Sequence, residues 1–247
     1  MFKAPRSVAV LTGAGISAES GIETFRATDG LWANHPVEEV ATPEGFARNP
    51  QKVYDFYNQR RQQLLSSDIK PNAAHTALAK FEYEFNGSFL LITQNVDNLH
   101  FEAGSRSVAE IHGNRTKIRC IDCNLRLPRD DFLVFPDELP PRCPECRGIV
   151  KGDGVMFGEP IPADVLEVCY KQTSMSDCMI VVGTSATVFP AASFPSAVWQ
   201  DVGHLIEINP FETPLTHYSK VVLRGESGEI LPLLTEEVGR RLPKEEI

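Results

Sequence analysis

Four cysteines stand in two pairs, each with two residues between its members. Cys120 and Cys123 form the first pair, Cys143 and Cys146 form the second, and 19 residues separate the pairs. Two such turns can present four thiolates to one tetrahedral zinc ion, and four sulfur ligands leave no open position for catalysis. A redox site normally needs one pair, and a reducing cytoplasm disfavours disulfides. We therefore expect a structural zinc site.

A second chemical signature is the glycine-rich segment 13–17, Gly-Ala-Gly-Ile-Ser, which directly follows an apolar run. Glycines at a strand-to-helix turn let the backbone approach a diphosphate, whose charge then meets amide donors. A plain tight turn is the alternative. The dinucleotide fingerprint of dehydrogenases also needs a second strand that ends in an acid about 20 residues on. The next strand-like run begins only near Phe89, so an ordinary dehydrogenase is disfavoured.

Similar clusters of glycine and polar residues follow the other apolar runs. The five clusters are 13–17, Gln94-Asn95-Val96-Asp97, Gly183-Thr184-Ser185, Asn209 and 225–228. Any one of these clusters could be an ordinary turn, because these residue types favour turns. Ligands of open α/β sheets bind at the carboxyl ends of the strands. Five clusters at that edge predict a site large enough for a nucleotide.

Among the six histidines, His112 is distinguished by its place in the chain. Gly113 follows it, and the predicted zinc module begins seven residues after that glycine. This places His112 near a hinge between two lobes, where clefts form, and histidine exchanges protons near neutral pH. His112 is therefore a candidate catalytic residue, while most of the histidines are expected on the surface or in helix caps.

The elements that must position these residues alternate along the chain. Short apolar runs, typical of strands buried on both faces of a parallel sheet, occupy residues 7–12, 89–93, 178–182, 204–208 and 220–223. Helix-length stretches occupy residues 162–173, 190–200 and 229–242. This alternation predicts an α/β fold with a Rossmann-like parallel sheet and right-handed crossovers.

Two segments interrupt the alternation. Residues 32–85 lack a strand-like run and are predicted to form several helices, whereas residues 119–150 carry the paired cysteines and five prolines that break any long element. We expect a large nucleotide-binding sheet domain and a small domain formed by a helical insertion and a zinc module. The predicted large domain comprises 1–36, 86–118 and 151–247, and the small domain comprises 37–85 and 119–150.

Composition limits the remaining possibilities. The 247 residues include 24 Lys and Arg against 33 Asp and Glu, a formal charge of −9, with 42% hydrophobic residues. These values exclude a disordered or fibrous chain, and the acidic balance disfavours a general nucleic-acid binder. No apolar run approaches the roughly 18 residues that span a bilayer, and no signal peptide is recognisable. We expect a cytoplasmic protein in which Cys169 and Cys178 are ordinary buried thiols.

Taken together, the motifs resemble the signature of the sirtuins, which are NAD-dependent protein lysine deacylases. They follow the family's order from Val8 to about Leu233: the segment 13–22 with Thr24-Phe25-Arg26, then 93–97, His112-Gly113, the four paired cysteines, Phe157-Gly158-Glu159 and Gly183-Thr184-Ser185. The chain departs from the family pattern at Glu23, where proline is common, and at Met156, where tryptophan is common.

The resemblance implies a role for each site residue, with NAD as co-substrate. The residues implied to bind NAD are Gly13, Ala14, Gly15, Ser17, Ala18, Phe25, Arg26, Gln94, Asn95, Asp97, Gly183, Thr184, Ser185, Asn209 and Ser227. His112 and Asn95 would be catalytic, and Phe157 would bind the substrate. The acyl-lysine oxygen would displace nicotinamide, and His112 would then act as general base on the ribose hydroxyls. The products would be nicotinamide, free lysine and O-acyl-ADP-ribose.

The stretch 51–65 bears on the acyl group. Five of its residues share one face at helical spacing: Val53, Phe56, Tyr57, Arg60 and Leu64. Arg60 would either extend from the edge of that face to water or meet a carboxylate inside an apolar channel, with Tyr57 as second donor. The resemblance favours the second. Tyr57 and Arg60 match the Tyr-x-x-Arg pair of bacterial-type sirtuins that remove succinyl, malonyl or glutaryl groups, and Ala41 matches the small residue that widens their pocket.

The sequence leaves three candidate functions for this chain. The first is a lysine deacylase that acts on succinylated, malonylated and acetylated proteins or peptides, as a monomer, without nucleic-acid or membrane partners. The second is mono-ADP-ribosyl transfer, which uses the same NAD site. The third is a zinc ribbon that only binds a partner, which the acidic chain and the strand-end clusters disfavour.

Overall fold

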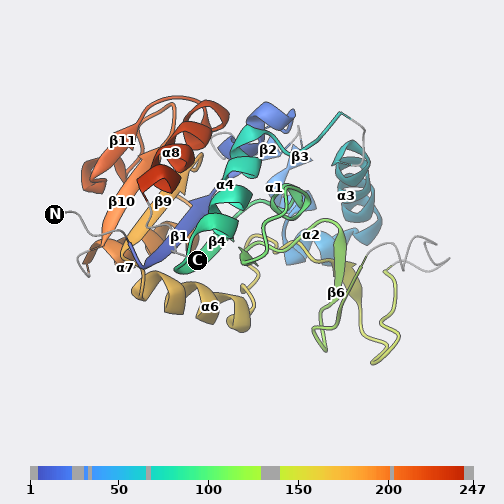
Figure 1. The fold of residues 1–247 in the computed structure, drawn as a ribbon. Coiled ribbons are helices and arrows are strands. Elements are labelled where there is room, and N and C mark those ends of the chain that lie inside the picture. Colours follow the sequence, from blue (N-terminus) through green and yellow to red (C-terminus); the bar gives the residue numbers. More distant parts are fainter. Residues whose placement is uncertain are drawn as a thin grey trace.

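The computed structural model describes residues 5–23, 31–32, 35–64, 68–128, 140–200 and 203–241. Figure 1 shows a large domain built around one sheet, with α1, α2, α3 and β6 gathered to one side of it. Within these described ranges, no helix has both the length and the apolar character needed to cross a membrane.

The large domain contains six parallel strands: β1 (Ser7–Thr12), β4 (Ser88–Thr93), β5 (Val108–Glu110), β9 (Cys178–Val182), β10 (His204–Ile208) and β11 (Val221–Leu223). Their order across the sheet is β11-β10-β9-β1-β4-β5. This is the doubly wound order of dinucleotide-binding sheets, in which the chain changes direction at the first strand. The predicted α/β fold with a Rossmann-like sheet is confirmed.

Both faces of the sheet are covered, which explains why its strands are apolar at consecutive positions. α4 (Ala73–Glu84) and α8 (Ser227–Arg241) cover the face that carries Val8 and Val10. α6 (Ala163–Ser174) and α7 (Phe194–Gln200) cover the opposite face, which carries Ala9 and Leu11. α4 therefore packs on the large sheet, although it belongs to the segment 37–85.

The elements beside the large domain comprise a small sheet and a helical group. The small sheet is antiparallel, with the order β7 (Arg126–Pro128), β6 (Lys117–Cys120) and β8 (Val150–Gly152). The helical group contains α1 (Val37–Val40), α2 (Pro43–Arg48) and α3 (Pro50–Leu64), preceded by the paired strands β2 (Leu31–Trp32) and β3 (His35–Pro36). The helices predicted for residues 32–85 are thus present.

Short helices complete the described part of the fold. They are α5 (Leu99–Glu102) and the 3₁₀ helices η1 (Ala14–Ser20), η4 (Ala191–Ser193) and η5 (Thr216–Tyr218).

Capping side chains fix where two of the longer helices begin. α2 begins after Thr42, whose hydroxyl accepts the N–H of Gly45 at 3.0 Å. α4 begins after Asn72, whose side chain accepts the N–H groups of Ala74 and His75. Such caps satisfy the first amides of a helix.

Candidate functional site

The turn after β1 and the loop after β9 meet through backbone atoms. The N–H of Gly15 donates to the carbonyl of Gly183 at 2.8 Å, and the N–H of Gly13 donates to the carbonyl of Val182 at 3.0 Å. A Cβ atom on Gly15 would lie 2.7 Å from the Cα of Gly183, and Gly183 has a φ of +58°. Both positions therefore require glycine. Because glycines carry no side chain, a diphosphate can approach the backbone closely at this turn.

Ser17, Asn95 and Asp97 form a hydrogen-bonded group beside this turn. The Ser17 hydroxyl donates to Asp97 Oδ2 at 2.7 Å and accepts from Asn95 Nδ2 at 3.1 Å. Asn95 Nδ2 also lies 3.1 Å from the carbonyl of Gly13, and Asp97 Oδ1 accepts the N–H of Leu99 at 3.0 Å. Burial raises the pKa of Asp97, and these hydrogen bonds oppose that rise. Three predicted site residues are thus in direct contact.

Two buried histidines lie beneath this group. His75 Nε2 is 3.4 Å from the Ser17 hydroxyl, and the rings of His75 and His100 have centroids 4.8 Å apart. His100 Nε2 is 3.0 Å from the Thr12 hydroxyl. Burial lowers the pKa of His75 to about 4 and that of His100 to about 3, so both rings are neutral near pH 7. The expectation that most histidines are surface or capping groups fits His75, which caps α4, whereas His100 is an exception, buried in the core.

His112 is half-buried between the large sheet and the small one. Its Nδ1 lies 3.1 Å from the carbonyl of Gln94. A carbonyl can only accept a hydrogen bond, so Nδ1 carries the proton and Nε2 keeps a free lone pair in the neutral ring. Burial lowers the pKa of His112, which favours that neutral form. Gly113 follows with a φ of +77° and has no room for a Cβ atom against Asp153.

The remaining strand-end residues connect to the same edge of the sheet. Gln94 Nε2 donates to the Thr184 hydroxyl at 2.9 Å, and Asn209 Nδ2 donates to the Thr184 carbonyl at 2.8 Å. The Ser227 hydroxyl donates to Glu19 at 3.2 Å. These bonds link the loops after β4, β9, β10 and β11 to the segment after β1. The five sequence clusters therefore meet at one edge, as expected.

The other residues expected to bind NAD differ in how far the structure describes them. Ala14 is half-buried, whereas Ala18 and Ser185 have exposed side chains. Phe25 and Arg26 lie outside the described residues, so their placement stays a prediction.

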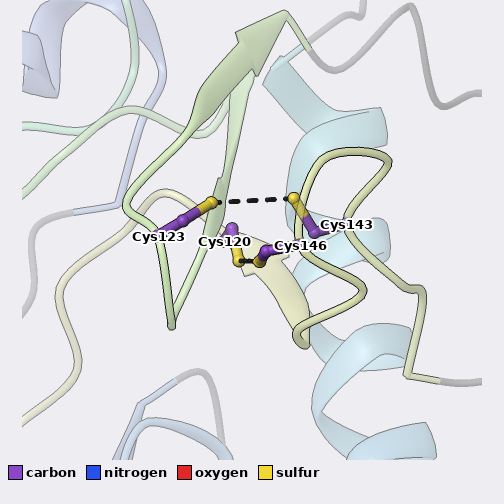
Figure 2. Close-up of side chains that lie close together, drawn as sticks. All are labelled: Cys120, Cys123, Cys143 and Cys146. Atoms are coloured by element: carbon purple, nitrogen blue, oxygen red, sulfur yellow. Dashed lines mark hydrogen bonds between the residues drawn. The ribbon is translucent and has the colours of Figure 1, made fainter.

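The four paired cysteines converge at the end of the small sheet (Figure 2). Their sulfur atoms all lie within 4.8 Å of one another. The Sγ atoms of Cys120 and Cys146 are 3.5 Å apart, and those of Cys123 and Cys143 are 3.7 Å apart. Tetrahedral zinc with bonds of about 2.3 Å requires sulfur separations of about 3.8 Å. The donor set and its spacing fit a structural zinc ion.

The two unpaired cysteines lie away from this cluster. Cys169 is buried among apolar residues of the core, and Cys178 is half-buried at the start of β9. Burial raises the pKa of Cys169 to about 12 and that of Cys178 to about 11. Both are therefore unreactive thiols at neutral pH.

α3 carries the residues expected to select the acyl group. The guanidinium of Arg60 stacks over the ring of Phe56, with Cζ 4.5 Å from its centroid. Burial raises the pKa of Tyr57 to about 12. Ala41 is buried and packs in a cluster that includes Phe56 and Tyr57. Its carbonyl accepts the N–H of Phe157 at 2.8 Å, and the Phe157 side chain is 44% exposed.

A cavity of about 60 Å³ lies between α3 and the segments that carry His112 and Asp97. Its wall includes Phe46, Val53, Tyr54, Tyr57, Val96, Arg115, Lys151, Gly152, Gly154, Val155 and Met156. The N–H of Val155 donates to the carbonyl of His112 at 2.9 Å, and Val96 stands between Asn95 and Asp97 in the chain. Arg60 is not part of this wall. Arg115 is part of this wall. Sequence patterns do not identify it as a site residue, because it belongs to none of the motifs.

Buried charges join the small sheet to the segment after β8. Arg119 Nη2 lies 2.5 Å from Glu159 Oε1, and Lys151 Nζ lies 3.0 Å from Glu159 Oε2. Arg119 Nε is 3.5 Å from Asp153 Oδ1. Glu159 also accepts the N–H of Met156 at 2.9 Å. One carboxylate therefore holds two cations of the small sheet and the backbone next to Phe157.

Known proteins share this arrangement. Residues 13–190 match the model of the Sir2 family. An NAD-dependent protein deacylase of Pyrococcus abyssi is 44% identical over 241 residues, 96% of this chain and 95% of its own. A crystal structure of a Sir2 homolog–NAD complex is 43% identical with a TM-score of 0.85, covering 97% of this chain and 91% of that chain. A Sir2–p53 peptide–NAD⁺ structure is 33% identical with a TM-score of 0.80, covering 96% and 95%. The chain belongs to the Sir2 family, the sirtuins.

Proposed function

We propose that this protein removes succinyl and malonyl groups from lysine side chains, and acetyl groups as well. As a Sir2-family protein with deacylases among its relatives, it is an NAD-dependent protein deacylase. The preference for acidic acyl groups is the finer proposal. The observation that carries it is the position of Tyr57 in the wall of a largely apolar cavity, with Arg60 one turn further along α3.

The residues at the sheet edge suit displacement of nicotinamide followed by proton transfer. We assign the NAD diphosphate to the backbone of Gly13, Gly15 and Gly183, and the nicotinamide carboxamide to Asn95 and Asp97. Nε2 of His112 is the atom that takes the proton from a ribose hydroxyl, because Nδ1 is held by the carbonyl of Gln94. A positioned general base contributes about 10²–10⁴-fold to the rate.

The size of the cavity suits a short acyl chain. A water-sized group needs about 10–15 Å³ of such volume, so the cavity of about 60 Å³ has room for roughly four to six of them. Beyond the amide carbonyl, a malonyl group has four non-hydrogen atoms, a succinyl group has five and an acetyl group has one. The two acidic chains fill the space, whereas acetyl leaves most of it empty.

Arg60 and Tyr57 supply the polar contacts that an acidic chain needs. A guanidinium can bind a carboxylate through two parallel hydrogen bonds, and Phe56 restricts Arg60 by stacking beneath it. Tyr57 lines the cavity, whereas Arg60 lies one turn further along α3, outside its wall, so we assign the Arg60 contact to the carboxylate at the end of the acyl chain. Acetyl-lysine gains none of this attraction, so its binding depends on the peptide and NAD alone.

Substitution of Arg60 tests the assignment. Arg60→Met should lower kcat/KM for a succinylated peptide by about 10- to 100-fold, the loss of one charge-assisted contact, and leave kcat/KM for the acetylated peptide within about threefold. Arg61→Met is the matched control, because it removes the same charge about 100° around the helix. Equal losses on both peptides, or equal effects of the two substitutions, would defeat the assignment.

Mono-ADP-ribosyl transfer is not favoured, because the curated relatives are deacylases. Radiolabelled NAD distinguishes the two reactions. Deacylation leaves the label in a small acyl-ADP-ribose, whereas transfer leaves it on protein. A zinc ribbon that only binds a partner does not account for the six-stranded sheet or the Sir2 family match.

We also propose that the enzyme works in the cytoplasm as a monomer, with a small domain drawn from segments 37–85 and 119–150, apart from α4, which packs on the large sheet. A reducing compartment keeps the four paired cysteines available as zinc ligands. Light scattering coupled to size-exclusion chromatography measures the oligomeric state, and a mass of two chains would contradict this part of the proposal.

A further inference from the structure

Arg115 occupies a special position between the catalytic segments and the acyl cavity. It lies three residues after His112, and its backbone N–H donates to the carbonyl of Val96 at 2.9 Å. This bond ties Arg115 to the loop that carries Asn95 and Asp97. Its partly buried side chain forms part of the cavity wall opposite α3. A cation is therefore built into the space assigned to the acyl chain.

The neighbours of Arg115 in the cavity wall are mostly apolar, among them Phe46, Val53 and Val155. A second cation of the wall, Lys151, is committed elsewhere. Its Nζ lies 3.0 Å from Glu159 Oε2 and 2.7 Å from the carbonyl of Gly154. Lys151 is thus paired within the protein, whereas the charge of Arg115 acts on Tyr57, which lines the same cavity.

The charges around Arg115 describe a site suited to an anion. Burial lowers the pKa of Arg115, and the like charge of Arg60 lowers it further, whereas Tyr57 and Asp97 act in the opposite direction. The positive charges of Arg60 and Arg115 therefore oppose one another, and Arg115 lies in the wall of a largely apolar cavity. An anion bound between them would convert that repulsion into attraction.

We propose that Arg115 is a second specificity-determining residue, whose guanidinium binds the terminal carboxylate of the acyl chain together with Arg60 and Tyr57. This inference rests on the proposed preference for acidic acyl groups and adds a residue from a different segment. Tyr57 lines the cavity from α3, with Arg60 one turn further along that helix, and Arg115 lines it from the segment that follows His112. Contacts from two sides fix the distance between the lysine amide and the carboxylate, and so favour chains of succinyl length.

A different role for Arg115 would be to position Asp97, on which its charge also acts. The two roles predict different kinetics. Loss of a carboxylate contact affects only acidic acyl substrates. Loss of an Asp97 contact affects nicotinamide displacement, and therefore every acyl substrate equally.

The test compares succinylated and acetylated forms of one peptide with five enzymes: the native protein, Arg115→Met, Arg115→Lys, Arg60→Met and the control Lys117→Met. Arg115→Met should lower kcat/KM for the succinyl peptide by about 10- to 100-fold and change that for the acetyl peptide by less than about threefold. Arg115→Lys should recover part of the loss, since it keeps the charge without the planar fork. Lys117→Met is the control, because it removes a positive charge two residues along, outside the cavity wall.

The acetyl reaction also reports whether each variant is folded, and thermal unfolding checks this independently. An unchanged succinyl-to-acetyl ratio in Arg115→Met, beside a reduced ratio in Arg60→Met, would overturn the role of Arg115 and leave the proposed function standing. Equal losses on both peptides would assign Arg115 to Asp97 instead. A native enzyme without any preference for the succinyl peptide would overturn both proposals.

Discussion

Replacing Glu159 with glutamine should destabilise the protein, because two buried cations share its carboxylate. The side chains of Arg119 and Lys151 are only 9% and 5% exposed. Breaking a buried ion pair costs about 3–5 kcal/mol, since it leaves a charge without compensation. Asp153 still faces Arg119 at 3.5 Å after the change, so we take the lower end, about 3 kcal/mol. At about 2–4 °C per kcal/mol for a chain of this size, Tm should fall by about 6–12 °C.

Thermal unfolding followed by circular dichroism measures this shift. Glu236→Gln is the matched control, because Glu236 pairs with Arg240 on the surface of α8 at 3.2 Å. Exposed helix pairs of this spacing contribute about 0.3–0.5 kcal/mol, so the control should lower Tm by only about 1–2 °C. A Tm shift for Glu159→Gln no larger than that of the control would contradict the cost assigned to leaving Arg119 and Lys151 without this carboxylate.

The remaining predictions concern the metal and the proton. Cys143→Ser should lose bound zinc, measured by elemental analysis, and unfold the small sheet, because structural zinc contributes folding free energy; a folded and fully active variant would contradict this. The pKa of His112 lies below its usual 6.5, so the base form predominates at pH 7 and kcat/KM should fall only as the pH drops through that lowered pKa. A decline whose midpoint lay above pH 6.5 would contradict the assignment of His112 as the base.

The large sheet was predictable because burial on both faces leaves a direct mark on the sequence. β1, β9 and β10 follow the apolar runs residue by residue. β5 does not give this signal, since it has three residues and only its central one, Ala109, is buried. The packing of α4 on the large sheet is likewise a tertiary outcome, because a helix's period marks its apolar face but not the surface that this face meets.

The site was predictable where local chemistry is specific. The spacing of the paired cysteines indicates a metal site, and the glycine-rich turn after a strand marks a place where a ligand can approach the backbone; the structure brings the four cysteines together and joins the turn to the loop after β9. His100 and Arg115 carry no such mark. The first is buried by contacts with β1 and α4, and the second lines a cavity whose other walls come from distant segments. Only the folded chain brings these partners together.

The backbone contact between Gly15 and Gly183 separates recognition of the co-substrate from recognition of the acyl group within one enzyme. In the assignment proposed above, chiefly main-chain groups bind the co-substrate there, and substitution of neighbouring side chains would leave those groups intact. In the same proposal, acyl preference depends on a few exchangeable side chains on other segments, namely Tyr57, Arg60 and Arg115. Divergence among related enzymes can therefore alter which modification is erased while the nucleotide they consume stays the same.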